Sequence, residues 1–353
     1  MIENSEKRLE LQLKKWIEQD SWAPVRSFVR TGGYNGIAQG AATVVSPLAP
    51  GRRDPSGCGE DITAKTEIFA SQSVIMIGKA MFDYIDSLMP LAVPSLARSI
   101  GQSLQSFIGK VFEGYDAAIG KVTEEKGLAI VLDSIVFVEY IVPKIVARMD
   151  HALECTVGET RLLLGFSQTQ NEALLHKFGK LMASLYVNST VGWNGTNYTE
   201  IAKGAEGEVK APRNVFNDVV DQSQSLIRKL ADAAPSSPYI TVLTKTIIEE
   251  FIAELERERN GFWINVATQG ISRPGLHQLT LDLKYFAHLC EKFMSKQAND
   301  LIKAMLKRAK KNRKKGGSGD SQEPDPSDEW YDRAIRANTT RDKIFSNFIN
   351  NLN

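Results

Sequence analysis

Apolar residues recur every three or four positions along most of the chain, which is the spacing of helices with one buried face. The pattern is clearest in 95–120, at Leu96, Ile100, Leu104, Phe107, Ile108, Val111, Tyr115 and Ile119. In 62–88 the stripe consists of Ile68, Ile75, Phe82 and Ile85. The same reasoning predicts helices over 3–19, over 127–150 with a kink at Pro143, and over 159–186.

The second half of the chain shows equally strong stripes. They predict helices over 213–232, 237–258 and 275–309, and a final short helix from Trp330 onward. No segment alternates apolar and polar residues in the manner of a strand. We therefore expect an all-α protein, built as an elongated bundle or as stacked helical pairs.

Breaks in the pattern divide the chain into predicted parts. Glycine, proline and serine dominate 31–60, and polar residues and glycine dominate 187–211, so both read as loops. The expected organisation is an N-terminal helix and Gly/Pro-rich linker (1–60), a first helical bundle (61–186), a polar loop (187–211), a second helical bundle (212–310), a basic and disordered linker (311–329) and a tail helix (330–353).

Overall charge and cysteine usage exclude several classes of protein. The net charge is +1, which disfavours nucleic acid as a specific partner. The three cysteines form no CxxC pair, so a zinc site and a disulfide framework are both disfavoured and a reduced compartment fits best. The N-terminus lacks the apolar core of a signal peptide. The most apolar run, 128–149, contains Asp133, Glu139 and Lys144, which favours a buried helix over a transmembrane one.

Catalytic signatures are absent from the sequence. It contains no GxSxG elbow, no GxxxxGK[ST] loop and no HExxH pair, so we expect no catalytic, cofactor-binding or metal-binding residues. His277 and His288 are interpreted as ordinary helix residues, and Cys290, which falls on an apolar stripe, as a small core residue. An α-helical enzyme whose site is assembled from distant residues remains an alternative.

Two further features invite a functional interpretation. The basic run consists of Lys307, Arg308, Lys310, Lys311, Arg313, Lys314 and Lys315. It is a candidate site for membrane headgroups or other anions, and it is equally well explained as a solvated helix end. The pair Phe262–Trp263 is either a partner anchor or, as we favour, a plug between consecutive helices.

Three segments combine into a longer pattern: APRNVFNDVVDQSQSLIRKLADAA, ITVLTKTIIEEFIAELERERNGFW and PGLHQLTLDLKYFAHL. This pattern resembles the C-terminal helical region of the exocyst component eighty-four family, in its plant-type form. The matching positions are Phe216, Phe262, Trp263, Gly275, Leu276, Gln278, Leu279, Leu281, Asp282, Leu283, Lys284 and Tyr285. FEGYDAAIGKV, FVEYIVPKIVARM with Pro143 and Lys144, and DEWYDRAIRA with Asp328, Glu329 and Trp330 add weaker resemblances in the same order.

The resemblance implies a cullin-repeat-like rod of stacked helical bundles and a structural role for the matching positions. It implies a non-catalytic scaffold subunit of the exocyst, which tethers secretory vesicles to the plasma membrane in exocytosis. The expected partners are other exocyst subunits, with small GTPases and anionic membrane lipids as candidates. The expected location is cytoplasmic, peripheral at the plasma membrane or on secretory vesicles. A generic helical adaptor of another complex is the alternative.

Overall fold

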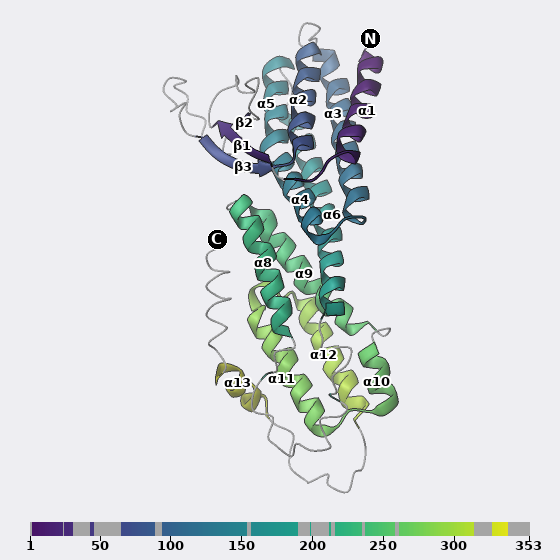
Figure 1. Ribbon diagram of the computed structural model, residues 1–353, viewed down its shortest axis with the longest axis vertical. Coiled ribbons are helices and arrows are strands. Elements are labelled where there is room, and N and C mark those ends of the chain that lie inside the picture. The colour runs from purple at the N-terminus through teal and green to yellow at the C-terminus, as the bar shows by residue number, and fades with distance from the viewer. Residues whose placement is uncertain are drawn as a thin grey trace. The chain divides into compact units, whose positions relative to one another are not determined.

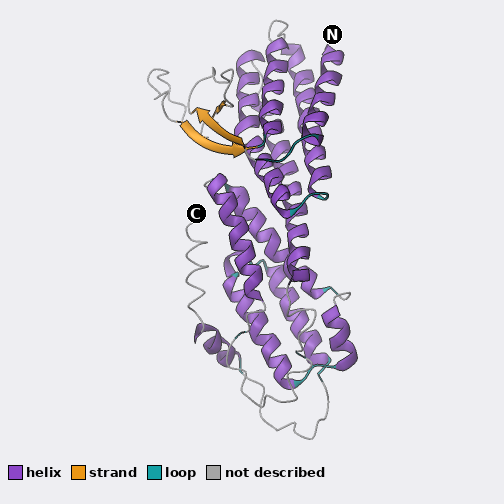
Figure 2. Cartoon of the chain, in the orientation of Figure 1, coloured by secondary structure: helices purple, strands orange, loops and turns teal. Residues whose placement is uncertain are grey.

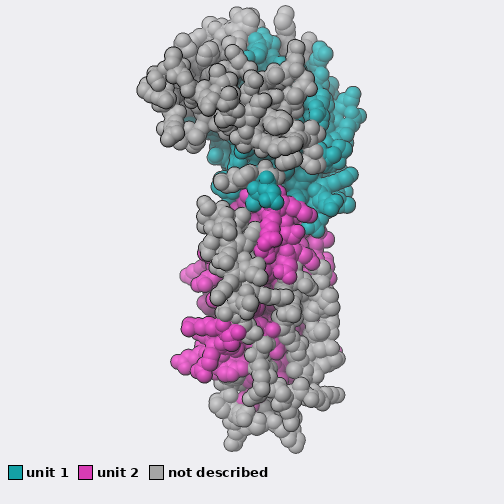
Figure 3. Space-filling view, turned by 60° about the vertical axis from the view of Figure 1, so that its left-hand side comes forward, with its two compact units in different colours: residues 1–178, 230–239 teal, residues 179–229, 240–353 magenta. Residues whose placement is uncertain are grey.

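Helices make up most of the structure, and the predicted all-α class is confirmed (Figure 1). The computed structural model describes residues 2–23, 25–30, 43–45, 65–88, 94–153, 157–189, 198, 212, 216–234, 237–257, 261–313 and 327–337. The chain forms two compact units, residues 1–178 with 230–239 and residues 179–229 with 240–353 (Figure 3). The predicted stacked rod and the predicted domain boundaries stay predictions.

Unit 1 is a helical bundle in which α1, α2, α3 and α5 lie side by side (Figure 1). Its elements are α1 (Ile2–Glu18), α2 (Gln72–Leu88), α3 (Pro94–Ile119), α4 (Glu124–Val136), the π turn η2 (Phe137–Ile141), α5 (Val142–Leu153) and the first part of α6 (Val157–Ser189). The expected apolar stripes form its core. In α1, for example, Leu9, Leu13 and Ile17 are buried.

A small three-stranded sheet in unit 1 was not predicted (Figure 2). Strand β1 (Val25–Arg30) lies between β2 (Thr43–Val45), which is parallel to it, and β3 (Lys65–Ala70), which is antiparallel. The expectation of a helix over 62–88 is therefore wrong over Lys65–Ala70, and Ile68 belongs to β3. β3 is too short to reveal a period, and its strand state depends on pairing with a segment distant in sequence. β2 lies inside the predicted 31–60 loop, most of which falls outside the described residues.

The predicted helix over 127–150 is divided by the π turn η2. The Val142 N–H donates to the carbonyl of Phe137, which is a bond to the fifth preceding residue. Pro143 follows at once. Proline has no N–H and its ring crowds the carbonyl four residues earlier, here that of Glu139, so regular α-helix cannot run through this point unchanged. The wider π turn accommodates the proline ring at this position.

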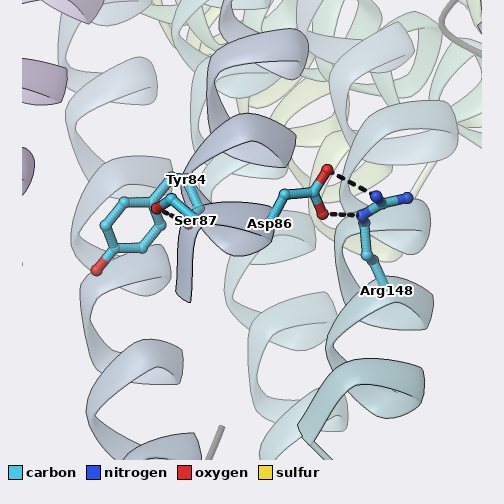
Figure 4. Close-up of polar contacts among 4 residues, drawn as sticks. All are labelled: Tyr84, Asp86, Ser87 and Arg148. Atoms are coloured by element: carbon cyan, nitrogen blue, oxygen red, sulfur yellow. Dashed lines mark hydrogen bonds and ion pairs between the residues drawn. The ribbon is translucent and has the colours of Figure 1, made fainter. Parts of the chain in front are cut away.

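Polar contacts tie α2 to its neighbours in unit 1 (Figure 4). The guanidinium of Arg148 on α5 donates to both carboxylate oxygens of Asp86 on α2, with the shorter contact 2.5 Å. Such two-point pairing fixes orientation as well as distance. The Tyr84 hydroxyl donates to Glu6 on α1 over 3.0 Å, and the Ser87 hydroxyl donates to the Tyr84 carbonyl within α2. α2 is thus held from both sides.

The described helices of unit 2 are the remaining part of α6, α8 (Asn217–Ala233), α9 (Pro238–Glu256), α10 (Gly261–Gln269), α11 (Arg273–Leu289), α12 (Lys296–Lys311) and α13 (Asp328–Ala337). The last residues of α8 and the first residues of α9 belong to unit 1. α13 packs on α11. Phe216, Phe251 and Phe286 form an aromatic cluster with ring centroids 5.3–6.1 Å apart. The core unites helices that are far apart in sequence.

The single helix expected over 275–309 is two helices, so that prediction is wrong at its centre. α11 ends at Leu289, a 3-10 turn follows at Glu291–Phe293, and α12 begins at Lys296. The Ser295 hydroxyl accepts the N–H of Ala298 and caps α12. The apolar spacing continues from α11 into α12, because both helices face the same core. Periodicity alone therefore could not reveal the break between them.

Candidate functional site

The Gly275–Tyr285 segment, which carries the longest family-like motif, forms α11 and two contact surfaces on it. α11 begins with a capped end, where the Ser272 hydroxyl accepts the N–H of Gly275 over 3.1 Å and Pro274 occupies the first turn. One surface binds Tyr198, which lies in the predicted 187–211 loop. The other binds α13.

Gly275 is required because the backbone of Tyr198 crosses the start of α11 at this point. A Cβ at Gly275 would lie 1.7 Å from the Tyr198 carbonyl oxygen and 2.7 Å from its carbonyl carbon. No side chain can occupy that space, so the position admits only glycine unless the backbone moves. The Ser272 hydroxyl also donates to the Tyr198 carbonyl, over 3.5 Å.

Asp282 is the buried polar centre of the same surface, with only 1% of its area exposed. One carboxylate oxygen accepts the Tyr198 hydroxyl at 2.6 Å and the other accepts the Gln278 amide at 2.9 Å. A carboxylate taken out of water needs such donors, because an unpaired buried charge costs several kcal/mol. The Tyr198 ring is fully buried and packs edge-on against Phe262, with centroids 5.6 Å apart.

A second surface of α11 holds α13. Lys284 donates to Asp328 over 2.5 Å, and its ammonium lies 5.0 Å from the centre of the Tyr331 ring. Leu281 and Tyr285 pack with Tyr331 and Ile335, and Leu289, Trp330 and Ala334 cover the edge of this cluster. The motif therefore joins two segments to α11: the one around Tyr198, which precedes α11 in the sequence, and α13, which follows it.

The pair Phe262–Trp263 is buried at the start of α10, as the packing interpretation predicts. The Trp263 indole N–H donates to the carbonyl of Leu255 at the end of α9, over 2.7 Å. The Arg308 guanidinium lies 4.7 Å from the centre of the Trp263 ring. The indole thus connects α9, α10 and α12, which is a structural task.

The basic run is split between packing and solvent. Arg308, besides covering Trp263, donates to the Glu256 carbonyl, and Arg313 pairs with Ile271 in an isolated bridge. Lys307, Lys310 and Lys311 are exposed, and Lys303 is exposed one turn earlier on α12. Lys314 and Lys315 lie outside the described residues. The exposed lysines follow helical spacing and form one positive face on α12.

Unit 1 contains a buried acidic centre that sequence reasoning missed. Asp133 on α4 accepts the N–H of Ser71 over 2.7 Å, and Asp20 accepts the N–H of Ser73 over 3.0 Å, so both carboxyl groups cap the start of α2. Burial raises the pKa of Asp133 to about 7, although its bonds to Ser71 act in the opposite direction. The sequence showed only that Asp133 interrupts an apolar run.

A second perturbed carboxyl group lies in the π turn. Burial raises the pKa of Glu139, which accepts the Ser237 hydroxyl over 2.7 Å. Nearby in sequence, burial lowers the pKa of Lys144 to about 8. Shifted pKa values can mark catalytic sites, but structural contacts produce them as well. Each shift here has a structural cause in helix packing.

The remaining candidate chemistry is sparse in the described part of the chain. There, no group of three or more His, Cys, Asp or Glu side chains is placed to hold a metal ion. His277 is partly buried and His288 exposed on α11. Cys290 is buried, and burial raises the pKa of its thiol far above the ordinary value, as expected of a core residue.

Among the described helices, none is both long enough and apolar enough to cross a membrane. Comparison of the chain with protein-family models, with curated proteins and with solved structures finds no match.

Proposed function

We propose that this protein is a non-catalytic helical scaffold that acts through protein–protein contacts, as a subunit of an exocyst-type complex that tethers secretory vesicles to the plasma membrane. Its place would be cytoplasmic, at the periphery of the plasma membrane or of secretory vesicles. The observation that carries the proposal is the arrangement of the motif residues. Gly275 and Asp282 contact Tyr198, Lys284 contacts α13, and Gln278 donates to Asp282 within α11.

A scaffold needs a surface whose shape does not change when a partner binds, because ordering a flexible surface reduces affinity. The contacts around α11 meet that need. The buried carboxylate of Asp282 has donors on both oxygens, and the indole of Trp263 bonds to a neighbouring helix end. These groups are used for positioning, which favours a binding role over turnover.

Affinity capture of the tagged chain from cells tests the proposal. We expect other exocyst subunits among the recovered proteins, well above a tag-only control. Gly275→Leu should reduce their recovery, because a leucine cannot share the space that the Tyr198 carbonyl occupies. Gly165→Ala, at an exposed position where an added Cβ would meet nothing within 4 Å, should leave recovery unchanged. Capture of a different set of proteins would replace the exocyst assignment with a generic adaptor.

The positive face of α12 supports an additional role at anionic membranes. Lys307, Lys310 and Lys311 are exposed together, and each lysine near an anionic surface contributes about 1 kcal/mol. Replacing all three by glutamine should therefore weaken binding to phosphatidylserine vesicles on the order of a hundredfold. Replacement by arginine is the matched control and should preserve binding. Vesicle binding that is insensitive to the glutamine substitutions would remove this role.

A further inference from the structure

The α13-facing surface of α11, formed by Leu281, Lys284, Tyr285 and Leu289, has the chemistry of a helix-binding groove. We propose that this surface binds an amphipathic helix of a partner protein in place of α13. The partner helix would carry an acidic residue in its first turn, an aromatic residue three positions later and an aliphatic residue seven positions later. The inference rests on the proposed scaffold function and names the kind of partner that this surface takes.

The pattern of the partner helix is read from the segment that now occupies the surface. Asp328, Tyr331 and Ile335 lie at positions 0, +3 and +7 of one helix face. Tyr331 and Ile335 are buried against α11, while Asp328 bonds to Lys284 at the rim. Helix-in-groove recognition generally depends on anchors with this spacing.

α13 is a weakly held occupant. It has only ten residues, and helices this short are marginal in water unless packing supports them. Two of its side chains are buried in the cluster. The Asp328 carboxylate is 89% exposed, so its ion pair with Lys284 adds little to the free energy of docking. A partner helix with a longer apolar face would compete with it successfully.

The α11 surface would keep its shape when α13 leaves, because other contacts hold α11. The Ser272 cap fixes its start, Asp282 bonds to Tyr198 on a neighbouring face, and Phe286 packs in the aromatic cluster of unit 2. Leu281 is 0% exposed and Tyr285 6% exposed with α13 in place. Removing α13 would uncover both, and an uncovered apolar patch of this kind favours binding of another chain.

Charge complementarity favours a partner with an acidic first turn. Hydrogen bonding and charge from Lys284, with a smaller effect of Lys310, hold the pKa of Asp328 below its usual range. Lys307 and Lys311 are exposed on the same helix as Lys310. An acidic helix start placed at this rim would meet positive potential, and an acidic side chain there also suits the positive end of its own helix dipole.

A peptide competition experiment on the full chain tests the inference. The probe is a fluorescent, end-capped synthetic peptide of residues 327–337, and its binding is followed by anisotropy. The Tyr331→Ala/Ile335→Ala chain should bind it at least tenfold more tightly than the wild-type chain, whose own α13 occupies the surface. Adding Leu281→Ala to that chain should abolish binding. Circular dichroism of each variant checks that the other helices remain folded.

A charge exchange separates groove binding from unspecific binding. The peptide with Asp328→Lys should bind the opened chain several-fold more weakly, and Lys284→Glu in the chain should restore its binding. Equal binding of the peptide to wild-type and opened chains, or no binding to the opened chain, would overturn the inference. Concentration-dependent dimers that disappear with Leu281→Ala would assign the surface to a second copy instead. Cellular capture tests the proposed function separately, so the two failures are distinguishable.

Discussion

The close approach of Tyr198 to Gly275 permits a quantitative prediction. In Gly275→Ala the new Cβ would stand 1.7 Å from the Tyr198 carbonyl oxygen, whereas ordinary contact begins near 3.4 Å. The structure can respond by shifting the backbone or by releasing Tyr198. A shift within a packed core costs about 1–3 kcal/mol or more. Helix propensity offsets less than about 1 kcal/mol of this.

Releasing Tyr198 is at least as costly. It exposes an aromatic ring, which costs about 1.5–3 kcal/mol, and it removes the hydroxyl donor of the buried Asp282, which costs a similar amount. The substitution takes the less costly route, the backbone shift, so we expect Gly275→Ala to destabilise unit 2 by about 1–3 kcal/mol. Gly165→Ala, in an open part of α6 that belongs to unit 1, is the control and should leave the stability of unit 2 unchanged.

Urea unfolding followed by hydrogen exchange of α11 amides measures this effect, because a signal from unit 2 is needed where two units can unfold separately. Tyr198→Phe then shows whether the structure responds by shifting the backbone or by releasing Tyr198. If Gly275→Ala releases Tyr198, removing the hydroxyl in that background should cost nothing further, although alone it costs about 1.5–3 kcal/mol. A Gly275→Ala protein within about 0.5 kcal/mol of wild type would refute the reasoning.

Three other substitutions test the contacts described above. The folded protein keeps the Asp133 proton up to about pH 7, whereas the unfolded chain releases it near 3.8, so stability is lost as pH rises through this window. Asp133→Asn should remove most of the loss that falls between pH 5 and pH 8, about 3 kcal/mol, when urea melts at these two pH values are compared. Asp86→Asn should cost less than about 1 kcal/mol, since its partner Arg148 is part-exposed, and added salt should shrink the difference in melting temperature. Trp263→Phe should cost about 2 kcal/mol by denaturant titration, because the carbonyl of Leu255 loses its donor; a neutral result would mean that water replaces the indole.

Helix positions follow from the sequence to a large extent. α1, α3, α6 and α9 begin and end within two or three residues of the predicted limits. In α1, α3 and α9 a one-sided apolar stripe marks these limits, whereas α6 also exposes Leu162 and Leu185. The misses share a physical cause. The strand state of β3 depends on pairing with β1, and the break after Leu289 depends on a cap rather than on a change in apolar spacing.

The candidate site was only half visible in the sequence. The motif from Gly275 to Lys284 and the tail near Asp328 stood out as separate patterns, and their contact with each other could not be derived from spacing. Tyr198 gave no signal at all, because one tyrosine in a polar, glycine-rich loop has no period. Its partner Asp282 stood out as a motif position, but neither its burial nor its bond to Tyr198 could be derived from the sequence.

The π turn between α4 and α5 has a consequence for how this stretch tolerates changes in length. A π turn closes its hydrogen bond over one residue more than an α turn does, so Phe137–Ile141 holds a surplus residue. A deletion elsewhere in α5 would rotate everything beyond it by about 100° and carry Arg148 away from Asp86. A deletion inside the turn preserves the downstream phase, but it places Pro143 in a regular α turn, where its ring crowds a carbonyl. One residue of this helical stretch is therefore dispensable once Pro143 is replaced, and its location is within Phe137–Ile141.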